Sequence, residues 1–217
     1  MIKFNERNLS EYTLYIFDFD LTLADTRRTA ELAYKSAFAA CGAYYDNNKL
    51  FDFLSESLEM TYSKIQHPSI GVKEFIHIFD KKIHEYIQTT TALYQDAIDF
   101  ISMLLGKGKE LAIVTNKDRE SIQMILKKYK LSDLFLSLVC AEDVVNKKPN
   151  KEPIANCLRE TNHLPTEAVY FGDALNDLIC AQNAGVDFIY VNRYKQELPF
   201  ENSVVEIESF NDIVLNS

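Results

Sequence analysis

Two carboxylates, two residues apart, follow a short apolar run near the N-terminus. Residues 13–17 lead directly into Asp18-Phe19-Asp20-Leu21-Thr22. In an extended chain Asp18 and Asp20 point the same way, so their repulsion must be offset by a cation or by a shared proton. A loop that merely starts with acidic turn residues would have the same sequence, and this motif alone does not decide between the two interpretations.

A third carboxylate follows another apolar run, in Gly172-Asp173-Ala174-Leu175-Asn176-Asp177. In a doubly wound sheet the carboxyl ends of adjacent strands face one crevice. Asp18, Asp20 and Asp173 would then converge there. A set of oxygen ligands suits Mg²⁺ rather than zinc, and Gly172 would let the backbone approach closely.

Two further segments offer groups that can bind an anion. Thr115 and Asn116 follow an apolar run and precede a helical pattern, whose N-terminal N–H groups would attract an anion. Thr115 could equally be an ordinary helix N-cap. Lys148, before Pro149, offers a positive charge to the carboxylates, although a lone lysine in a lysine-rich stretch is most often a solvated surface residue.

The apolar runs beside these motifs predict strands that are buried on both faces. Such runs, β-branched or aromatic and not strictly alternating, are typical of a parallel sheet covered by helices. Amphipathic helical patterns lie between them, and this alternation predicts a doubly wound α/β domain. The predicted strands are 13–17, 111–114, 168–171, 188–191 and, more weakly, 137–140, and the helical patterns are 94–105, 122–129 and 154–158. Whether residues 204–207 add an edge strand stays open.

One long segment breaks the alternation of strands and helices. From about residue 25 to residue 91 the sequence has helical stripes, at 30–41, 50–58 and 72–87, and no convincing strand. Roughly 65 residues is too long for a loop in a compact domain, so we expect a helical insert with its own small core. The expected division is therefore 1–24 with 92–217 for the sheet domain and 25–91 for the insert.

The composition excludes several classes of protein. The chain has 217 residues, with 23 Lys and Arg against 32 Asp and Glu and a formal charge of −9, which argues against a nucleic-acid partner. No apolar run reaches the length of a membrane span, and the N-terminus lacks the apolar stretch of a signal peptide. Four scattered cysteines and four histidines have no zinc-site spacing. We expect a cytoplasmic protein, a monomer or a homodimer, with no membrane partner.

Taken together and in order, the four motifs resemble those of the haloacid dehalogenase superfamily of phosphohydrolases. They read D-F-D-L-T (18–22), I-V-T-N-K (113–117), K-P (148–149) and G-D-A-L-N-D (172–177). The resemblance extends from residue 14 to about residue 191 and implies a Rossmann-like core. It also implies that the helical insert is the superfamily's cap, in a subfamily similar to the phosphoglycolate phosphatases. Leu21 departs from the pattern, since many relatives have Gly there, and we expect a backbone conformation that tolerates Leu.

The resemblance implies a chemical role for each carboxylate. Asp18 would be the nucleophile that attacks phosphorus to give an aspartyl-phosphate. Asp20 would protonate the leaving oxygen and then take a proton from water. Mg²⁺ would be held by Asp18, Asp173 and the backbone carbonyl of Asp20.

The remaining motif residues would serve the phosphoryl group. Thr115 and the N–H of Asn116 would bind its oxygens, and Lys148 would offset the repulsion between the nucleophile and the anionic phosphate. Asp177 would orient Lys148 or a metal-bound water. Positioning and electrostatic stabilisation of a spread negative charge would then supply most of the catalysis.

Asp20 also limits the reaction, because dehalogenases and phosphonatases resemble this pattern but lack that acid. The leading hypothesis is a Mg²⁺-dependent phosphatase acting on a small phosphorylated metabolite. Phosphoglycolate-like compounds, sugar phosphates, nucleotides and pyrophosphate all stay open as substrates. The alternatives are a phosphosugar mutase, which also needs the acid, and a phosphate-binding regulatory protein without turnover.

Overall fold

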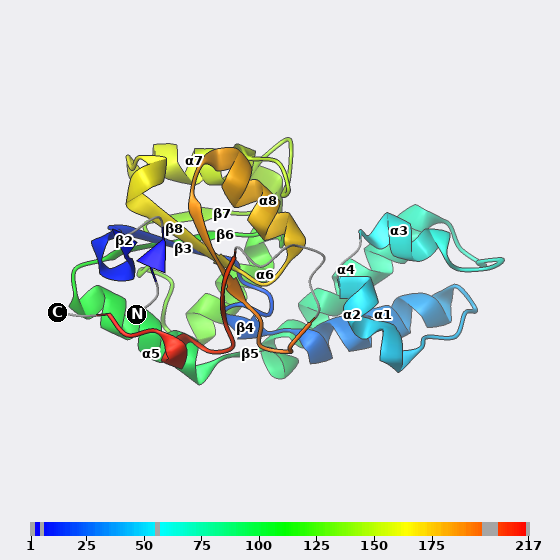
Figure 1. Ribbon diagram of the computed structural model, residues 1–217. Coiled ribbons are helices and arrows are strands. Elements are labelled where there is room, and N and C mark those ends of the chain that lie inside the picture. Colours follow the sequence, from blue (N-terminus) through cyan, green and yellow to red (C-terminus); the bar gives the residue numbers. More distant parts are fainter. Residues whose placement is uncertain (1–2, 5–6, 55–56, 197–203, 216–217) are drawn as a thin grey trace. The chain divides into compact units, whose positions relative to one another are not determined.

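The computed structural model describes residues 3–4, 7–54, 57–196 and 204–215. The chain divides into two compact units, one made of Met1–Ala24 with Leu93–Ser217 and the other of Asp25–Ala92. The first unit contains the main sheet and the second is helical (Figure 1). Within the described residues, none of the helices combines the length and the apolar character needed to cross a membrane.

A six-stranded parallel sheet forms the centre of the first unit. Its order is β10-β9-β8-β3-β6-β7, and every neighbouring pair runs parallel. The chain starts in the middle at β3, winds outward to one side and then returns to build the other side. The predicted doubly wound α/β fold is therefore confirmed. The strands are β3 (Leu14–Phe17), β6 (Glu110–Val114), β7 (Ser137–Val139), β8 (Ala168–Gly172), β9 (Asp187–Val191) and β10 (Val205–Ile207).

The residues of the central strands alternate between two covered faces. Leu14 and Ile16 pack in one apolar cluster with residues of α7 (Glu152–Thr161) and α8 (Leu175–Ala184). Phe17 points to the opposite face, where its ring lies edge-on to Phe100 of α5 (Gln95–Gly106). Figure 1 shows α7 and α8 on one side of the sheet and α5 on the other. Because both faces are buried, the strands read as continuous apolar runs.

Local signals set the ends of the helices in this unit. Asp118 is the N-cap of α6 (Arg119–Lys128), and its carboxylate accepts the N–H of Ser121 at 2.8 Å. The alternative that Thr115 caps this helix is therefore wrong. Helix α8 ends at Gly185, which adopts a left-handed conformation with φ of 72°.

The C-terminal segment completes the core through an aromatic cluster. Phe210, in a short 3-10 helix (Phe210–Asp212), stacks on Phe100 with ring centroids 4.9 Å apart. Phe17 stacks on Phe171 of β8 at 5.1 Å, and Phe210 lies edge-on to Phe17 at 5.9 Å. All four rings are buried. The segment also supplies β10, so residues 205–207 do add an edge strand.

In its described residues, the second unit has four α-helices and a short 3-10 helix (Asn47–Lys49) around an aromatic core of its own. Tyr34, Phe38 and Phe53 pack with neighbouring ring centroids 5.4 to 6.5 Å apart. The predicted stripe at 50–58 forms two helices, separated by residues outside the described part of the chain. The helices are α1 (Arg27–Ala40), α2 (Leu50–Leu54), α3 (Leu58–Ser63) and α4 (Val72–Thr90).

The start and the end of the helical unit are tied together. The hydroxyl of Thr29 lies 2.8 Å from that of Thr90 and 2.6 Å from that of Thr91. Two short strands, β4 (Ala24–Asp25) and β5 (Ala92–Leu93), pair where the chain enters and leaves the unit. Strand β1 (Lys3–Phe4) pairs antiparallel with β2 (Arg7–Asn8), and both precede the main sheet in the sequence.

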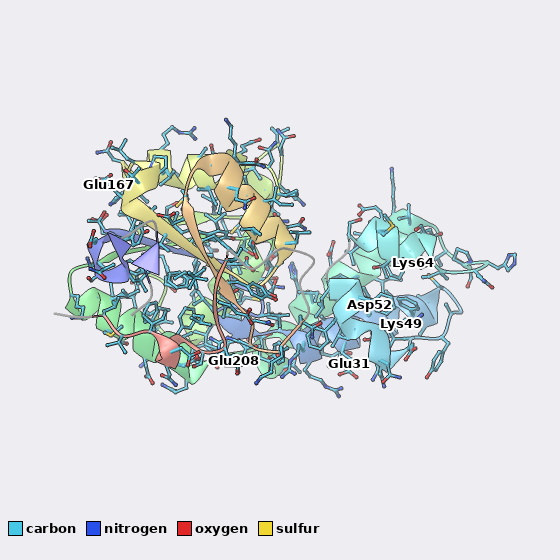
Figure 2. The ribbon with its side chains drawn as sticks, in the orientation of Figure 1. Glu31, Lys49, Asp52, Lys64, Glu167 and Glu208 are labelled. Atoms are coloured by element: carbon cyan, nitrogen blue, oxygen red, sulfur yellow. The ribbon has the colours of Figure 1, made fainter. Side chains whose placement is uncertain are left out.

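Charged residues of both signs cover the outside of the helical unit. Lys49, Asp52 and Lys64 are exposed there, and Figure 2 shows their side chains. Residues 25–85 hold eight basic and nine acidic side chains. This unit therefore carries almost no net charge, and most of the negative charge of the protein belongs to the other unit.

The backbone at Leu21 differs from our expectation, which was a conformation that tolerates Leu. Its φ is 55°, in the left-handed region that costs an L-residue about 1–2 kcal/mol. The N–H of Leu21 donates to the carbonyl of Ala24 at 2.8 Å, which closes a tight turn after the first motif. The side chain is only 8% exposed, and its burial offsets the strain.

Replacing Phe210 tests whether the C-terminal segment belongs to the core. Phe210→Ala should lower the free energy of unfolding by about 3–5 kcal/mol, because a large buried ring leaves a cavity. Val214→Ala is the matched control, since that side chain is 71% exposed. Urea unfolding followed by circular dichroism measures both variants. Equal, small effects would contradict a structural role for the segment.

Candidate active site

Loops that leave one edge of the sheet bring the motif residues together. Asp18 follows β3, Asp173 follows β8, and Asp177 lies in the first turn of α8. The strand register explains this placement, because Phe17 pairs with Phe171 and the segments after them emerge side by side. The three side chains each offer a carboxylate oxygen, and these oxygens lie within 4.8 Å of one another.

The ammonium group of Lys148 lies among these carboxylates. Its Nζ is 2.7 Å from Oδ1 of Asp18 and 2.6 Å from Oδ1 of Asp177. Lys148 is only 7% exposed and comes from the loop before α7. A buried charge is strongly unfavourable unless it is paired and hydrogen-bonded. Lys148 is therefore a built part of the site rather than a solvated surface lysine.

Tyr170 supplies the third partner of this ammonium. Its phenol oxygen lies 3.0 Å from Nζ of Lys148, and the phenol can donate to the carbonyl of Val114 at 3.0 Å. An ammonium has three N–H bonds, which Asp18, Asp177 and Tyr170 can fully use. Sequence analysis put Tyr170 in a buried strand and assigned it no role. Its hydroxyl is the one polar side-chain group in residues 168–171 and could have indicated a contact with the site.

Burial and mutual repulsion raise the pKa of two of the carboxylates, Asp18 and Asp173. Burial raises the pKa of Asp18 to about 7, against the attraction of Lys148 and with repulsion from Asp177 and Asp20. Burial, with repulsion from Asp18 and Asp177, also raises the pKa of Asp173 well above its ordinary value. Burial by itself lowers the pKa of Lys148. The negative charges of Asp177 and Asp18 outweigh this effect, so the pKa of Lys148 is raised.

The cluster has three carboxylates and one ammonium, so its negative groups outnumber its positive ones. Because of this excess, the site must take up a proton or a cation. Asp177 is already engaged, because its Oδ1 contacts Lys148 and its Oδ2 accepts the N–H of Ala174 at 3.1 Å. Asp18 and Asp173 are then the carboxylates with room for a metal ion. Their hard oxygen donors fit Mg²⁺.

Gly172 permits the close packing of Asp177. A Cβ atom at position 172 would lie 2.5 Å from Cβ of Asp177 and 2.6 Å from its Cγ and Oδ2. Contacts this short are forbidden, so any side chain here would push Asp177 away from Lys148. We expected the backbone at Gly172 to approach another group closely, and that group is the side chain of Asp177.

Thr115 and Asn116 lie beyond the end of β6. Thr115 is buried, and its hydroxyl accepts the N–H of Lys117 at 3.2 Å. The Asn116 side chain donates to the carbonyl of Lys148 at 3.2 Å and accepts its N–H at 3.1 Å. This pair of bonds joins the second motif to the third and fixes the backbone of Lys148.

Asp20 lies apart from the carboxylate cluster and pairs with Lys117. Nζ of Lys117 is 3.2 Å from Oδ1 of Asp20 and 3.3 Å from Oδ2. The Lys117 side chain is 11% exposed and that of Asp20 is 36% exposed. Lys117 belongs to the I-V-T-N-K motif, but its partner stands 97 positions earlier in the chain. No local pattern in the sequence indicates this pairing.

Arg193 anchors the loop that carries Asp20. Its Nε and one terminal nitrogen donate to the carbonyl of Thr22 at 3.2 and 3.1 Å. The other terminal nitrogen pairs with Asp96 at 2.9 Å, and the guanidinium lies 3.9 Å from the ring centroid of Tyr94. Sequence analysis assigned no role to Arg193, because it lies outside the four motifs.

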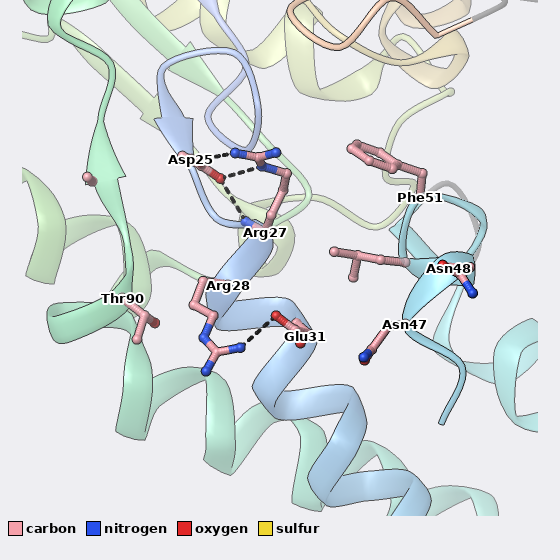
Figure 3. Close-up of a pocket in the computed structure, with 10 residues that line it drawn as sticks. Asp25, Arg27, Arg28, Glu31, Asn47, Asn48, Phe51 and Thr90 are labelled. Carbon is pink, nitrogen blue, oxygen red and sulfur yellow. Dashed lines mark hydrogen bonds and ion pairs between the residues drawn. The ribbon is translucent and has the colours of Figure 1, made fainter. Parts of the chain in front are cut away.

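The helical unit has a pocket of its own, of about 520 Å³ (Figure 3). Its arginines are neutralised within the pocket, since Arg27 pairs with Asp25 at 2.6 Å and Arg28 pairs with Glu31 at 2.8 Å. The polar and apolar lining has no excess charge. The lining residues are Asp25, Arg27, Arg28, Glu31, Asn47, Asn48, Leu50, Phe51, Thr90 and Ala92.

Comparison with known proteins gives consistent matches. Residues 15–191 match the family model for haloacid dehalogenase-like hydrolases. The pyrophosphatase PpaX of Bacillus cereus (strain B4264) is 32% identical over 174 residues, which are 78% of each chain. A Bacteroides fragilis structure assigned to the haloacid dehalogenase-like hydrolases has a TM-score of 0.83 at 24% identity, covering 93% of this chain and 100% of that one. A Lactobacillus plantarum structure assigned as a phosphoglycolate phosphatase has a TM-score of 0.78 at 20% identity, covering 93% and 97%. At these identities the two structures share the fold.

Adding one methyl group at position 172 tests the packing of Asp177. Gly172→Ala should destabilise the protein by about 1–3 kcal/mol, because the new Cβ overlaps Asp177. Gly106→Ala is the matched control, since a Cβ there meets nothing within 4 Å. Chemical unfolding of both variants measures the difference. A Gly172→Ala protein as stable as Gly106→Ala would contradict the close approach.

In the absence of metal, stability should fall as the pH rises from about 4 to 7. The folded protein raises the pKa of Asp18 from 3.8 to about 7, so over this range it keeps a proton that the unfolded chain releases. The stabilisation that this proton provides is complete below the pKa of Asp18 in the unfolded chain. It is lost as the pH rises through the pKa of Asp18 in the folded protein. Asp18→Asn should remove this part of the slope. Urea unfolding in EDTA across the range measures it, and an identical slope in both proteins would contradict the shift.

Proposed function

The chain belongs to the haloacid dehalogenase-like hydrolases, and from this membership we propose that it is a Mg²⁺-dependent phosphatase of small phosphorylated metabolites. The observation that carries the proposal is the buried contact of Lys148 with both Asp18 and Asp177. A fixed cation beside one carboxylate, at the edge of the sheet where ligands bind, suits attack on an anionic phosphate.

Asp18 is the proposed nucleophile. Lys148 binds its Oδ1, and among the described residues no donor contacts Oδ2, which can attack phosphorus. The new bond joins this oxygen to phosphorus while the bond from phosphorus to the leaving oxygen breaks. Lys148 and Asp177 keep the nucleophile in place, because both are buried and directly bonded.

Asp20 is the proposed general acid and base. It gives its proton to the leaving oxygen as that bond breaks. It then takes a proton from the water that attacks the aspartyl-phosphate, so that inorganic phosphate is released and Asp18 returns to a carboxylate. The anchoring of Thr22 by Arg193 supports this role, because it fixes the loop that carries Asp20.

Asp18, Asp173 and the backbone carbonyl of Asp20 would hold Mg²⁺. When bound, the ion offsets the repulsion between the carboxylates and the phosphate. Thr115 and the N–H of Asn116 are proposed to bind the phosphoryl oxygens, since both follow β6 at the same edge of the sheet. The helical unit is proposed to act as the cap that excludes water and contacts the rest of the substrate.

The test is phosphate release from a panel of phosphorylated metabolites, with Mg²⁺. Asp18→Asn should lower turnover by roughly four orders of magnitude or more, because it removes the nucleophile. Asp20→Asn should also lose most of its activity. Asp52→Asn is a control, since it removes one exposed carboxylate of the helical unit.

Full activity in both Asp18→Asn and Asp20→Asn would overturn the proposal. So would interconversion of sugar phosphates with little net phosphate release, which is the result for a mutase. A folded protein that binds Mg²⁺ and turns over none of the panel would favour a regulatory role instead.

A further inference from the structure

The ion pair between Lys117 and Asp20 points to the class of substrate. We propose that Lys117 binds the leaving group, and that the substrate is therefore a phosphate ester or anhydride whose leaving group carries a negative charge of its own. A carboxylate or a second phosphate would satisfy this requirement. The inference rests on the proposed function, in which Asp20 protonates the leaving oxygen.

The geometry places the ammonium next to the leaving group. A general acid must come within hydrogen-bond distance of the oxygen that it protonates. Nζ of Lys117 lies 3.2 and 3.3 Å from the two carboxylate oxygens of Asp20. The atoms just beyond the leaving oxygen must then pass close to this ammonium, at the position of the carboxylate in phosphoglycolate or of the second phosphorus in pyrophosphate.

The ammonium of Lys117 has capacity for another partner. It carries three N–H bonds, and among the described residues Asp20 alone contacts Nζ. The side chain is only 11% exposed, so water has limited access to the remaining N–H groups. An anionic acceptor on the substrate would complete the hydrogen bonds of Lys117.

The backbone of Lys117 is fixed, which favours a defined role. Its N–H donates to the hydroxyl of Thr115 at 3.2 Å, and its carbonyl accepts the N–H of Ala141 at 3.1 Å. The ammonium therefore extends from a rigid segment that also carries the proposed phosphate-binding residues. A site built on such a segment holds its groups more precisely than a mobile loop would.

The two lysines divide the charge between the two ends of the breaking bond. The N–H bonds of Lys148 are used by Asp18, Asp177 and Tyr170, on the side of the nucleophile. Lys117 lies on the side of the general acid, where it also stabilises the carboxylate that Asp20 becomes after giving up its proton. While Asp20 still holds its proton, a neutral leaving group would leave the ammonium without an anionic partner, which is unfavourable in a partly buried site.

The experiment compares substrates that differ in the charge of the leaving group. Phosphoglycolate and 2-hydroxyethyl phosphate are matched in length and differ in carboxylate against hydroxymethyl, and pyrophosphate is the anhydride case. Steady-state kcat/KM is measured for each with wild type, Lys117→Met and Lys117→Arg. Lys127→Met is the control, because it removes an exposed lysine from the following helix.

Wild type should prefer phosphoglycolate or pyrophosphate to 2-hydroxyethyl phosphate. Lys117→Met should reduce this preference by roughly 10- to 100-fold, the usual effect of losing a hydrogen bond between charged groups. Lys117→Arg should keep part of the preference, and Lys127→Met all of it.

Two results would overturn the inference while leaving the proposed function in place. One is a wild-type enzyme that hydrolyses these esters without regard to charge. The other is a Lys117→Met enzyme that loses the same factor on every substrate, which would mean that Lys117 only positions Asp20. If wild type releases phosphate from none of the substrates, the proposed function fails and the inference fails with it.

Discussion

The buried ammonium of Lys148 is the interaction on which the site depends. It lies 2.7 Å from Asp18 and 2.6 Å from Asp177, and its positive charge offsets part of the cost of burying the two carboxylates side by side. The dependence is mutual, because the carboxylates also keep the lysine protonated. Tyr170 uses the third N–H bond, and Asn116 fixes the lysine's backbone through two hydrogen bonds. Loops from separate strands are thereby joined at one point.

The fold makes this meeting possible by aligning its strands in parallel. β3 lies between β6 and β8, so the loops after the central strands leave the sheet at one edge. The same arrangement buries both faces of each central strand, which gives the loops a rigid base. The C-terminal segment adds to that base through the stacking of Phe210 on Phe100. Arg193 then holds the loop of the first motif through its two hydrogen bonds to the carbonyl of Thr22.

Excess negative charge gives the site its chemical character. Lys148 cannot neutralise Asp18, Asp173 and Asp177 together, so the cluster attracts a proton or a metal ion. Asp20 is not part of this cluster and pairs with Lys117. The two acidic residues of one short motif therefore lie in different electrostatic surroundings, Asp18 beside Lys148 within the carboxylate cluster and Asp20 beside Lys117.

The sequence by itself indicated the doubly wound α/β class and the helical insert, because continuous apolar runs are typical of strands buried on both faces and a three-to-four spacing is typical of amphipathic helices. It also predicted that Asp18, Asp20 and Asp173 would converge, since the ends of neighbouring parallel strands share an edge. The structure brings Asp18 and Asp173 together with Asp177, whereas the carboxylate of Asp20 pairs with Lys117. Only the tertiary structure decided the contact of Tyr170 with Lys148, the pairing of Lys117 with Asp20 and the bond from Arg193 to Thr22, whose residues stand 22, 97 and 171 positions apart. It also decided the left-handed turn at Leu21. Such contacts depend on how distant segments pack, and no local pattern carries that information.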